Sequence, residues 1–543
     1  MKKISRFYPL AILLLLSVVF FLNGWVSEDA YINFRVIEQL FGGQGLVWNP
    51  GERVQVFTSP LWLLVTAASR LFSSHLYANV IVLSYVLFLG SLAFLWKLFE
   101  STFSWLACCS LLLISSSFFD YTTSGLEYPL IYFLLTVFVF LYLSGCRQHI
   151  TRASLHRLVL VFALLLLTRH DLLMLCLPAF LYYLWRASRE FRARELLLIC
   201  IIYSAPFWLW TGFSLLYFGF PFPNTAYAKL GTGLEFVDLV REGLRYLLDL
   251  ARWDSISAVV LLAAAGLGLT GRKPALAYLA VGIALSVLYV IYAGGDYMRG
   301  RFFAPAFLVA AVLVCYQLAP LLADRKAQAG WLLAWLMYAV FYYHTPIASD
   351  FNHRTKTWLE WAADWEASRS GIVDARGIHS AVSSLGFYFG RDPNEPFPGG
   401  PYPADARAAN ESGEPVIVYG AIGMFGYFIQ PGTVVVDDMA LADPLLSRLP
   451  VSSDWRVSHY PRTLPTGYLE SLASGTNQIK DANLKEYYQH LVTITQGRQL
   501  FSLDRLKTIV LFNLGYFDYL LDAYVQAHPE IYRKAPRMMY LTD

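Results

Sequence analysis

The chain has 543 residues, of which 57% are hydrophobic, 16% aromatic and only 15% charged. The mean hydropathy of +0.46 excludes an ordinary water-soluble globule and predicts a polytopic α-helical membrane protein. The formal net charge of +3 is too small for a nucleic-acid footprint, and the basic residues lie in short loops, so we exclude nucleic acid as a partner.

Long apolar segments predict about eleven transmembrane helices, several of them short for a bilayer core of roughly 30 Å. The segments are 8–26, 77–98, 102–118, 128–145, 156–168, 172–187, 196–218, 256–270, 274–292, 303–322 and 329–344. The positive-inside rule places the basic connections in the cytoplasm, and these are Lys2 to Arg6, 147–157, 186–194, 272–273 and 325–326. An odd number of spans then places the C-terminal region outside the cytoplasm.

Two short segments after the first span predict helices that lie along the membrane. Residues 31–41 carry Ile32, Val36 and Leu40 at helical spacing. The apolar segment 60–72 is too short for a crossing, and counting it as one would reverse the side of every later basic loop. Both are therefore expected to be interfacial helices.

The chain becomes polar, and rich in Pro and Gly, from about residue 346. We predict a transmembrane domain over 1–345 and an extracytoplasmic α/β domain over 346–543. Within the second domain we expect strands at 415–419 and 433–436, a short helix at 421–429, a loop at 391–403 and a helical stretch at 503–527. The six cysteines lie in or beside apolar segments and predict neither a disulfide framework nor a zinc site.

The loops assigned to the outside hold most of the unusual polar residues. They comprise residues 27–76, 119–127, 169–171, 219–255 and 294–302. Ionisable groups beside hydrocarbon are costly and usually functional. If these loops converge, several carboxylates face several cations at one membrane surface, which suits a phosphorylated lipid and a polar acceptor.

Six blocks in these loops resemble the arabinofuranosyltransferases of the GT-C glycosyltransferases, including the mycobacterial terminal β-(1→2) enzymes and related pilin arabinosyltransferases. The blocks are EDAYI-x-x-R at 28–35, G-x-GLVWNPGE at 43–52, TSPLW at 58–62, SGLE at 124–127, PNT-x-YAK at 223–229 and GGDYM-x-x-RF at 294–302. A seventh block, DMALADP at 438–444, is similar to a stretch in the soluble part of these enzymes. The chain departs from the family pattern at Glu28, where an Asp is common, and at His170, where a Pro is more usual.

The resemblance implies a membrane glycosyltransferase that moves a pentofuranose, for which we expect D-arabinofuranose, from a polyprenyl-phosphate donor. It also implies a bacterial cytoplasmic membrane with the active site on the outer face. The acceptor is either a cell-envelope glycan or a secreted protein such as a pilin. No cofactor is required for this chemistry. Glu28 and Asp29 could hold a divalent metal through oxygen ligands, but a lipid-phosphate leaving group does not need one, so no metal is assigned.

The chemistry assigns roles to the residues in these blocks. A carboxylate general base removes the proton from the acceptor hydroxyl, and we expect Asp29 in this role with Glu28 as its catalytic partner. Cations stabilise the phosphate that leaves. The predicted substrate-binding residues are Arg35, Asn49, Glu127, Arg169, His170, Asp171, Asn224, Tyr227, Lys229, Asp296, Arg299 and Arg301. If the donor configuration is retained, either a second carboxylate such as Glu127 or Asp296 or a front-face route is required.

Each assignment has a structural alternative. Asp29 fits a helix N-cap, Glu28 and Glu127 fit helix-dipole acids, and Asn49 fits a turn. Lys229, Arg299 and Arg301 fit contacts with lipid headgroups. Asp437 fits the turn at the end of a strand. For the whole protein, the alternatives are a transporter or flippase for lipid-linked sugar, and a non-catalytic envelope or motility protein on the same scaffold.

Overall fold

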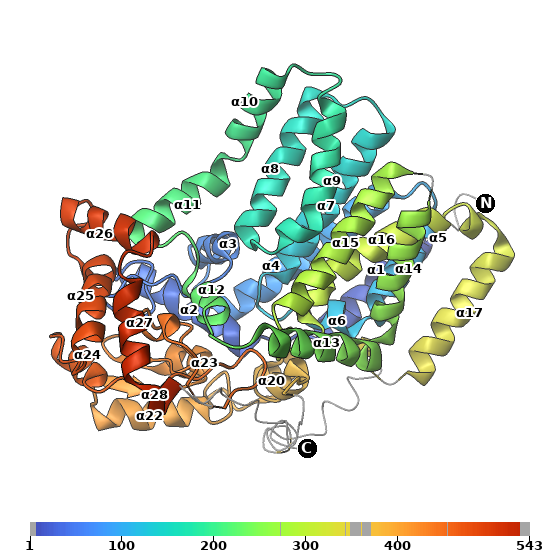
Figure 1. Ribbon diagram of the computed structural model, residues 1–543. Helices are drawn as coiled ribbons and strands as arrows, with labels where there is room; N and C mark the ends of the chain where they lie inside the picture. The colour runs from blue at the N-terminus through green and yellow to red at the C-terminus, as the bar shows by residue number, and fades with distance from the viewer. Residues whose placement is uncertain are drawn as a thin grey trace.

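The computed structural model describes residues 7–271, 273–342, 344–347, 360, 371–452 and 454–532, and the chain in these ranges is mostly helical (Figure 1). Lys2 to Arg6 and Arg272, which carry part of the predicted sidedness, lie outside the described residues. The helices before the C-terminal region are α1 (Phe7–Leu22), α2 (Glu28–Phe41), α3 (Pro60–Arg70), α4 (Leu76–Leu98), α5 (Thr102–Ile114), α6 (Ser116–Phe119), α7 (Tyr128–Arg147), α8 (Arg152–Thr168), α9 (Leu172–Ala187), α10 (Ala193–Tyr203), α11 (Ala205–Tyr217), α12 (Asn224–Leu230), α13 (Phe236–Trp253), α14 (Ser255–Thr270), α15 (Pro274–Tyr292), α16 (Ala304–Leu318) and α17 (Arg325–Phe341).

Every one of the eleven apolar segments contains a helix. Among the described residues, four helices are long and apolar enough to cross a membrane, or up to seven if each bent pair forms one span. The four are Leu76–Leu98, Tyr128–Arg147, Pro274–Tyr292 and Arg301–Leu318. These spans are those of a polytopic membrane protein. Eleven crossings, and their sidedness, stay predictions.

Small residues allow the apolar helices to approach closely. A Cβ at Gly282 of α15 would lie only 2.0 Å from the carbonyl oxygen of Leu175 in α9. Gly243 in α13 has the same relation to Ile291 in α15, at 2.2 Å. Close backbone approach is the usual way in which membrane helices gain packing contacts. The two glycines therefore hold α9, α13 and α15 together.

The segments predicted to lie along the membrane are helical, as α2 and α3. Most residues of α2 are buried, and the helix packs against α23 (Ile422–Phe428) of the C-terminal region. An additional helix, α13, occupies most of the second half of the loop 219–255, for which no helix was predicted. It turns by 111° into α14 and exposes an apolar stripe that includes Val237, Leu244 and Leu248. The helical spacing of these residues is the signal that the sequence analysis missed.

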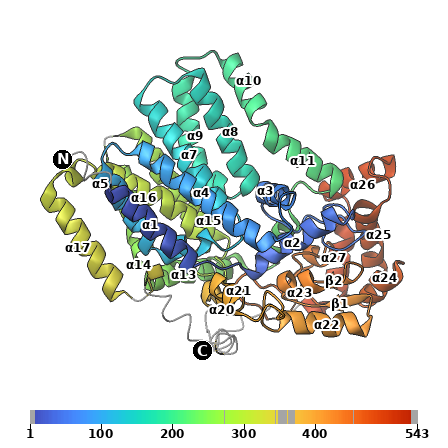
Figure 2. The same ribbon diagram turned by 180° about the vertical axis from the view of Figure 1, so that it is seen from behind.

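The C-terminal region is mainly helical and contains two short strands. Its elements are α20 (Ala375–Ser383), α21 (Leu385–Gly390), α22 (Tyr402–Ser412), β1 (Val416–Val418), α23, β2 (Val434–Val436), α24 (Tyr468–Ser474), α25 (Ala482–Gln496), α26 (Leu503–Asn513), α27 (Asp518–Ala527) and α28 (Pro529–Tyr532). The two strands pair in parallel, with Val416 opposite Val434 (Figure 2). Both strands and the short helix lie where the sequence predicted them, and the stretch 503–527 is two helices joined at Gly515, whose φ is +75°. A two-stranded sheet does not confirm the α/β class.

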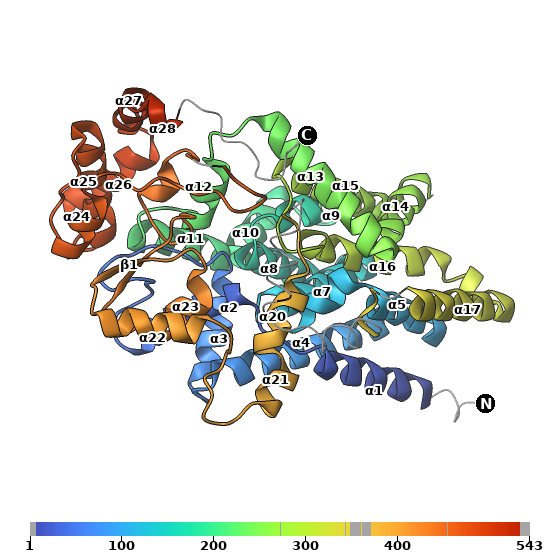
Figure 3. The same ribbon diagram turned by 90° about the horizontal axis from the view of Figure 1, so that it is seen from below.

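The last helices of the C-terminal region, α24 to α28, lie at one end of the molecule near α11, while α17 lies at the opposite end (Figures 1 and 3). The main buried apolar cluster runs without a break from Trp25 through Phe307 to Met424 and Val435. The predicted boundary at residues 345 and 346 lies close to residues outside the described ranges, so the two-domain division stays a prediction. The six cysteines are free thiols, as the sequence indicated.

Candidate active site at the ends of four helices

The predicted polar loops meet at one end of the apolar helices. Glu127 precedes α7, Arg169 follows α8, Asp171 precedes α9, and Asp296 follows α15. Because these helices alternate in direction, the four positions fall on the same side of the bundle. The polar groups therefore converge although they are distant in sequence.

Arg301 is the centre of a group of four side chains, which we call the Arg301 cluster: Asp29, Asp296, Tyr297 and Arg301. The guanidinium lies 3.2 Å from one oxygen of Asp29 and 2.6 Å from one oxygen of Asp296. The Tyr297 hydroxyl donates to the second Asp29 oxygen at 3.4 Å. The Asp29 side chain is 28% exposed and that of Asp296 is fully buried. Asp29 is thus the carboxylate of this cluster that an incoming group can reach.

Glycines position the loop that carries Asp296. Gly295 has φ +74° and its Cα approaches the Tyr246 side chain so closely that a Cβ would lie 2.6 Å away. Gly300 has φ +68°, and a Cβ there would lie 2.1 Å from the Ser117 hydroxyl. Positive φ and the absence of a side chain are both properties of glycine. The tight approach expected from the GGDYM-x-x-RF block is therefore present.

Arg169 forms a second ionic group. Its guanidinium donates to both oxygens of Asp171 at 2.9 and 3.0 Å, and to Glu127 at 2.8 Å. This guanidinium and that of Arg301 both lie against the Phe302 ring, at 5.1 and 5.0 Å from its centroid. The two ionic groups therefore share contact with one aromatic ring.

A cavity of about 640 Å³ opens beside both groups. Arg169, His170 and Asp171 line it from the bundle, and Tyr227 and Lys229 line it from α12. The remaining wall includes apolar side chains of the bundle and polar ones of the C-terminal region: Phe222, Leu230, Tyr289, Phe302, Ser447, Arg448, Ser458 and Tyr460. The cavity is thus amphipathic, and the bundle and the C-terminal region both contribute to it.

Two cations that line the cavity have no carboxylate partner among the described residues. The Lys229 ammonium donates to the Ser458 hydroxyl at 3.1 Å, and burial lowers the pKa of this lysine. The Arg448 guanidinium stacks on Tyr227 at 3.8 Å, and its Nη2 is buried without a hydrogen-bond partner in the described part of the chain. A buried cation without a counter-ion is costly. Both side chains are therefore ready to bind an anion.

Ser458 joins the cavity to the Arg301 cluster. Its hydroxyl donates to Asp296 at 2.8 Å and accepts from Lys229. Its φ is +63°, a conformation that residues other than glycine rarely adopt. Strained backbone of this kind is frequent at functional sites. Neither Ser458 nor Arg448 was predicted from the sequence, since both lie in the C-terminal region without a charged pattern around them.

Four predicted site residues lie elsewhere, in what we call the seam: Glu28, Arg35, Asn49 and Asn224. Each binds backbone groups of residues 424–443. The Glu28 carboxyl accepts from the amide of Met424 at 3.1 Å, and Arg35 donates to the carbonyls of Gly426 and Thr433. Asn49 exchanges two hydrogen bonds with the backbone of Val435, each 3.0 Å long. Asn224 donates to three carbonyls, those of Ala440, Leu441 and Asp443.

Burial changes the protonation of the seam and of the cavity wall. Burial, together with the nearby Asp29 carboxylate, raises the pKa of Glu28 to about 8. Burial also lowers the pKa of His170, which packs edge-on against Phe207 and Phe222. Glu28 therefore keeps its proton near neutral pH in the folded protein.

Arg299 has a structural partner. It forms an ion pair with Asp249 at 2.9 Å and stacks on Trp253 at 3.8 Å. Both partners belong to α13, so Arg299 fixes this helix to the loop that contains Asp296.

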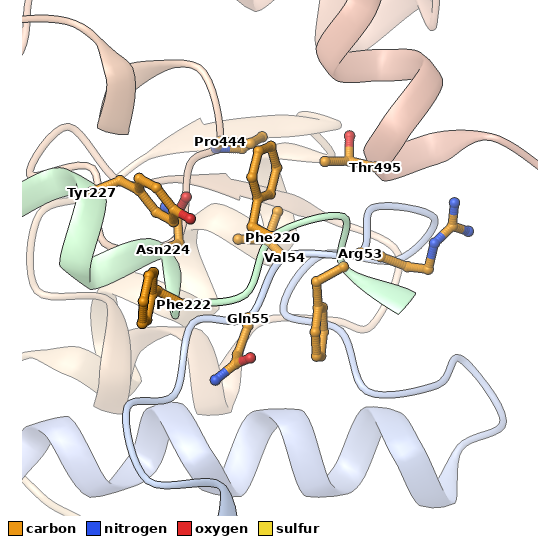
Figure 4. A pocket seen from close by; sticks show the side chains of 10 residues that line it. Arg53, Val54, Gln55, Phe220, Phe222, Asn224, Tyr227, Pro444 and Thr495 are labelled. Carbon is orange, nitrogen blue, oxygen red and sulfur yellow. The ribbon is translucent and has the colours of Figure 1, made fainter. Parts of the chain in front are cut away.

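A small cavity, of about 10 Å³, lies among Phe220, Phe222, Pro444 and the two α12 residues Asn224 and Tyr227 (Figure 4). It has room for about one water molecule. Tyr227 lines both cavities. The small cavity thus lies at the border between the large one and the seam.

Several structural alternatives are decided. Asp29 is the second residue of α2 and does not cap it, because Ser27 holds the N-cap position. Asp437 accepts from the amides of Met439, Leu441 and Ala442, so it forms the turn after β2. Within the described ranges no three His, Cys, Asp or Glu side chains form a group suited to a metal ion.

Comparison with known proteins gives one distant relative. The chain is 26% identical over 392 residues to the terminal β-(1→2)-arabinofuranosyltransferase of Corynebacterium glutamicum, and the match covers 65% of this chain. The chain spans about half (54%) of the length of that relative. No family model matches, and no solved structure matches. The resemblance seen in the sequence blocks is thus confirmed as a distant relationship.

Proposed function

We propose that this protein is a membrane glycosyltransferase that moves a pentofuranose, D-arabinofuranose by analogy with its distant relative, from a polyprenyl-phosphate donor to an acceptor outside the cytoplasm. The observation that supports the proposal is the amphipathic cavity, in which Lys229 and Arg448 lack carboxylate partners in the described part of the chain. A lipid phosphate supplies both the anion and the apolar chain that such a cavity fits.

We propose that the donor phosphate binds beside Lys229 and Arg448. Arg169, Arg299 and Arg301 already hold carboxylates, so a phosphate gains less from them. As the bond between the anomeric carbon and the phosphate breaks, negative charge grows on the leaving oxygen. Preorganised cations stabilise that charge without reorganising. The prenyl chain lies along the apolar wall that includes Phe222, Leu230 and Tyr289.

Asp29 is the proposed general base. It does not line the cavity itself, but it belongs to the Arg301 cluster, which Ser458 connects to Lys229 at the cavity wall. Arg301 and Tyr297 fix the two carboxylate oxygens, and part of the side chain stays exposed to an acceptor hydroxyl. Glu28 is turned to the Met424 amide, so we propose that it supports α2 and not the reaction.

A covalent sugar–enzyme intermediate would require a carboxylate nucleophile, and the two candidates, Asp296 and Glu127, are both held by other side chains. Asp296 is held by Arg301 and Ser458, and Glu127 is held by Arg169. Either one would have to leave its partners before it could attack the anomeric carbon. The geometry therefore favours direct displacement, or a front-face route if the configuration is retained, with Asp29 as the base.

The C-terminal region contributes Ser447, Arg448, Ser458 and Tyr460 to the cavity. We propose that the same region orients the acceptor, which is an envelope glycan or a secreted protein. A transporter of lipid-linked sugar is the alternative function. Transport predicts polar groups along a path through the bundle. The ionic groups here collect at one end of α7, α8, α9 and α15.

The test uses the purified full-length protein in lipid vesicles with synthetic polyprenyl-phosphoryl D-arabinofuranose. We expect release of polyprenyl phosphate and transfer of the sugar to an arabinan oligosaccharide or a pilin peptide. Donors that carry a hexose serve as the control for the sugar. Movement of the intact donor across the bilayer without cleavage of the anomeric bond would contradict the proposal and establish transport.

A further inference from the structure

A second large cavity lies at the end of the bundle opposite to the proposed active site. It has a volume of about 500 Å³ and lies between the start of α8 and α10. Its lining consists of Arg152, His156, Arg192, Arg194, Glu195, Leu198, Ile199, Ile202 and Tyr203. None of these residues takes part in the proposed reaction.

Helix α8 runs from the second large cavity to the proposed active site, so its length gives the distance between the two cavities. Arg152 at its start lines the second cavity, and Arg169 directly after its end lines the first. Its 17 residues span about 25 Å at 1.5 Å per residue. This length is close to the roughly 30 Å of a bilayer core. The two cavities therefore lie at opposite ends of α8, and they would face opposite membrane surfaces if α8 crosses the bilayer as the sequence predicts.

The second cavity is strongly basic. Of its three arginines only Arg152 has a carboxylate partner, Glu195 at 2.6 Å. Arg192 and Arg194 are exposed and form no ion pair within the described residues. They flank the first residue of α10, so both guanidinium groups start from the same short segment. A phosphate placed there would meet two available cations.

The same cavity continues into an apolar surface. Leu198 and Ile202 line the cavity while 48% and 61% exposed. They follow Arg194 at helical spacing, and Leu197 and Ile201 extend the exposed apolar surface of α10. His156 stacks on Tyr203 at 4.4 Å, and both rings line the cavity. Charge and apolar surface thus lie in the order of a lipid headgroup and its acyl chain.

We propose that this cavity binds one anionic phospholipid of the leaflet opposite to the active site. The phosphate binds Arg192 and Arg194, and an acyl chain lies along Leu198 and Ile202. A free phosphate would use the arginines but would leave the apolar wall exposed. An arginine near a membrane surface contributes about fivefold to the affinity for anionic lipid, so two arginines contribute about 25-fold.

The test measures binding of phosphatidylglycerol and of phosphatidylcholine with the same acyl chains to the detergent-purified full chain, by native mass spectrometry. We expect the Arg192→Gln/Arg194→Gln variant to bind phosphatidylglycerol about 25-fold more weakly, with phosphatidylcholine unchanged. The matched control is Arg157→Gln/Arg189→Gln, which removes two charges nearby but outside the cavity lining. It is expected to bind phosphatidylglycerol like the wild type.

Three results would overturn the proposal. The first is equal loss in the two double variants, which would mean diffuse surface attraction. The second is unchanged binding in Arg192→Gln/Arg194→Gln. The third is full displacement of phosphatidylglycerol by millimolar inorganic phosphate, which would identify a phosphate site. If the double variant does not fold, the single variant Arg194→Gln carries the same test with about a fivefold loss.

Discussion

The seam and the cavity both contain charged and amide side chains, but these side chains have different hydrogen-bond partners in the two regions. In the seam, Glu28, Arg35, Asn49 and Asn224 bind backbone amides and carbonyls of residues 424–443. Around the cavity, side chains bind other side chains, and Lys229 and Arg448 keep donors for a ligand. A polar residue in a motif is therefore not by itself evidence of catalysis, because its partners decide its role.

The comparison makes a general prediction. Substitutions in the seam leave buried backbone groups without partners, so they lower stability. Substitutions around the cavity leave the fold intact and lower the rate. Five experiments test this separation, from the largest expected effect to the smallest.

The first experiment replaces the proposed base. Asp29→Asn keeps the size of the side chain but removes its proton affinity, and loss of a general base costs typically about 10²- to 10⁴-fold in rate. We expect this loss in kcat with little change in the thermal midpoint. Glu28→Gln is the matched control, because it is the neighbouring carboxyl and belongs to the seam. Full transfer by Asp29→Asn would show that the base is another group.

The second experiment removes the Arg35 guanidinium, which donates hydrogen bonds across the seam. Arg35→Met retains the length of the side chain but leaves the carbonyls of Trp48, Gly426 and Thr433 without their donor. Unsatisfied buried groups cost about 1–3 kcal/mol each, so we expect a loss of several kcal/mol in unfolding free energy. The thermal midpoint in detergent measures it. A stable but inactive variant would instead place Arg35 in the reaction.

The third experiment removes the cations that lack carboxylate partners. Lys229→Met and Arg448→Met each lose one charged contact to the donor phosphate, worth about 1.5–3 kcal/mol. We expect kcat/KM for the polyprenyl-phosphate donor to fall about 10- to 100-fold in each. Lys485→Met, an exposed lysine of α25, is the control and keeps full activity. If both variants match it, the phosphate does not bind at this end of the cavity.

The fourth experiment separates strain from hydrogen bonding at Ser458. Both Ser458→Gly and Ser458→Ala lose the hydroxyl that joins Asp296 to Lys229, so both are expected to lose activity by about fivefold, the value of one hydrogen bond near 1 kcal/mol. Only glycine relieves the positive φ, so the Gly variant should have the higher thermal midpoint. Equal wild-type activity in both would limit Ser458 to a structural role.

The fifth experiment concerns the pH dependence of stability. The pKa of Glu28 is raised to about 8 by burial and by Asp29, from 4.5 in the unfolded chain. The unfolded state therefore loses this proton first, and the stability that Glu28 provides below pH 4.5 decreases as the pH rises toward 8. Glu28→Gln has no proton to lose. Its thermal midpoint should change less between pH 5 and pH 8 than that of the wild type, and an identical slope would contradict the assignment.

The helices were predictable where apolar length decides the structure. Each apolar segment contains a helix, and β1, β2 and α23 lie where local patterns placed them. The amphipathic α13 was missed because the segment was treated as one loop between spans. Its packing against α15 depends on Gly243 meeting a helix about 50 residues later, which local sequence does not reveal.

The site was predictable in part. The blocks at 28–35, 124–127, 169–171, 223–229 and 294–302 supplied the Arg301 cluster, the Arg169 group and Lys229. They also supplied Arg35, Asn49 and Arg299, whose partners turned out to be backbone groups or an α13 carboxylate. Arg448 and Ser458 do not belong to any recognisable sequence motif. They line the cavity only because the C-terminal region folds against the helix bundle.

The amino-acid sequence by itself determined the class of the protein, because runs of apolar residues have few alternatives to membrane-type helices, and it identified the loops that carry charge. The tertiary structure decided which charged and amide side chains are satisfied by backbone and which face a cavity. The physical reason is that a hydrogen-bonding group is defined by its partner. For Arg35, Asn49 and Asn224 that partner lies more than 200 residues away along the chain.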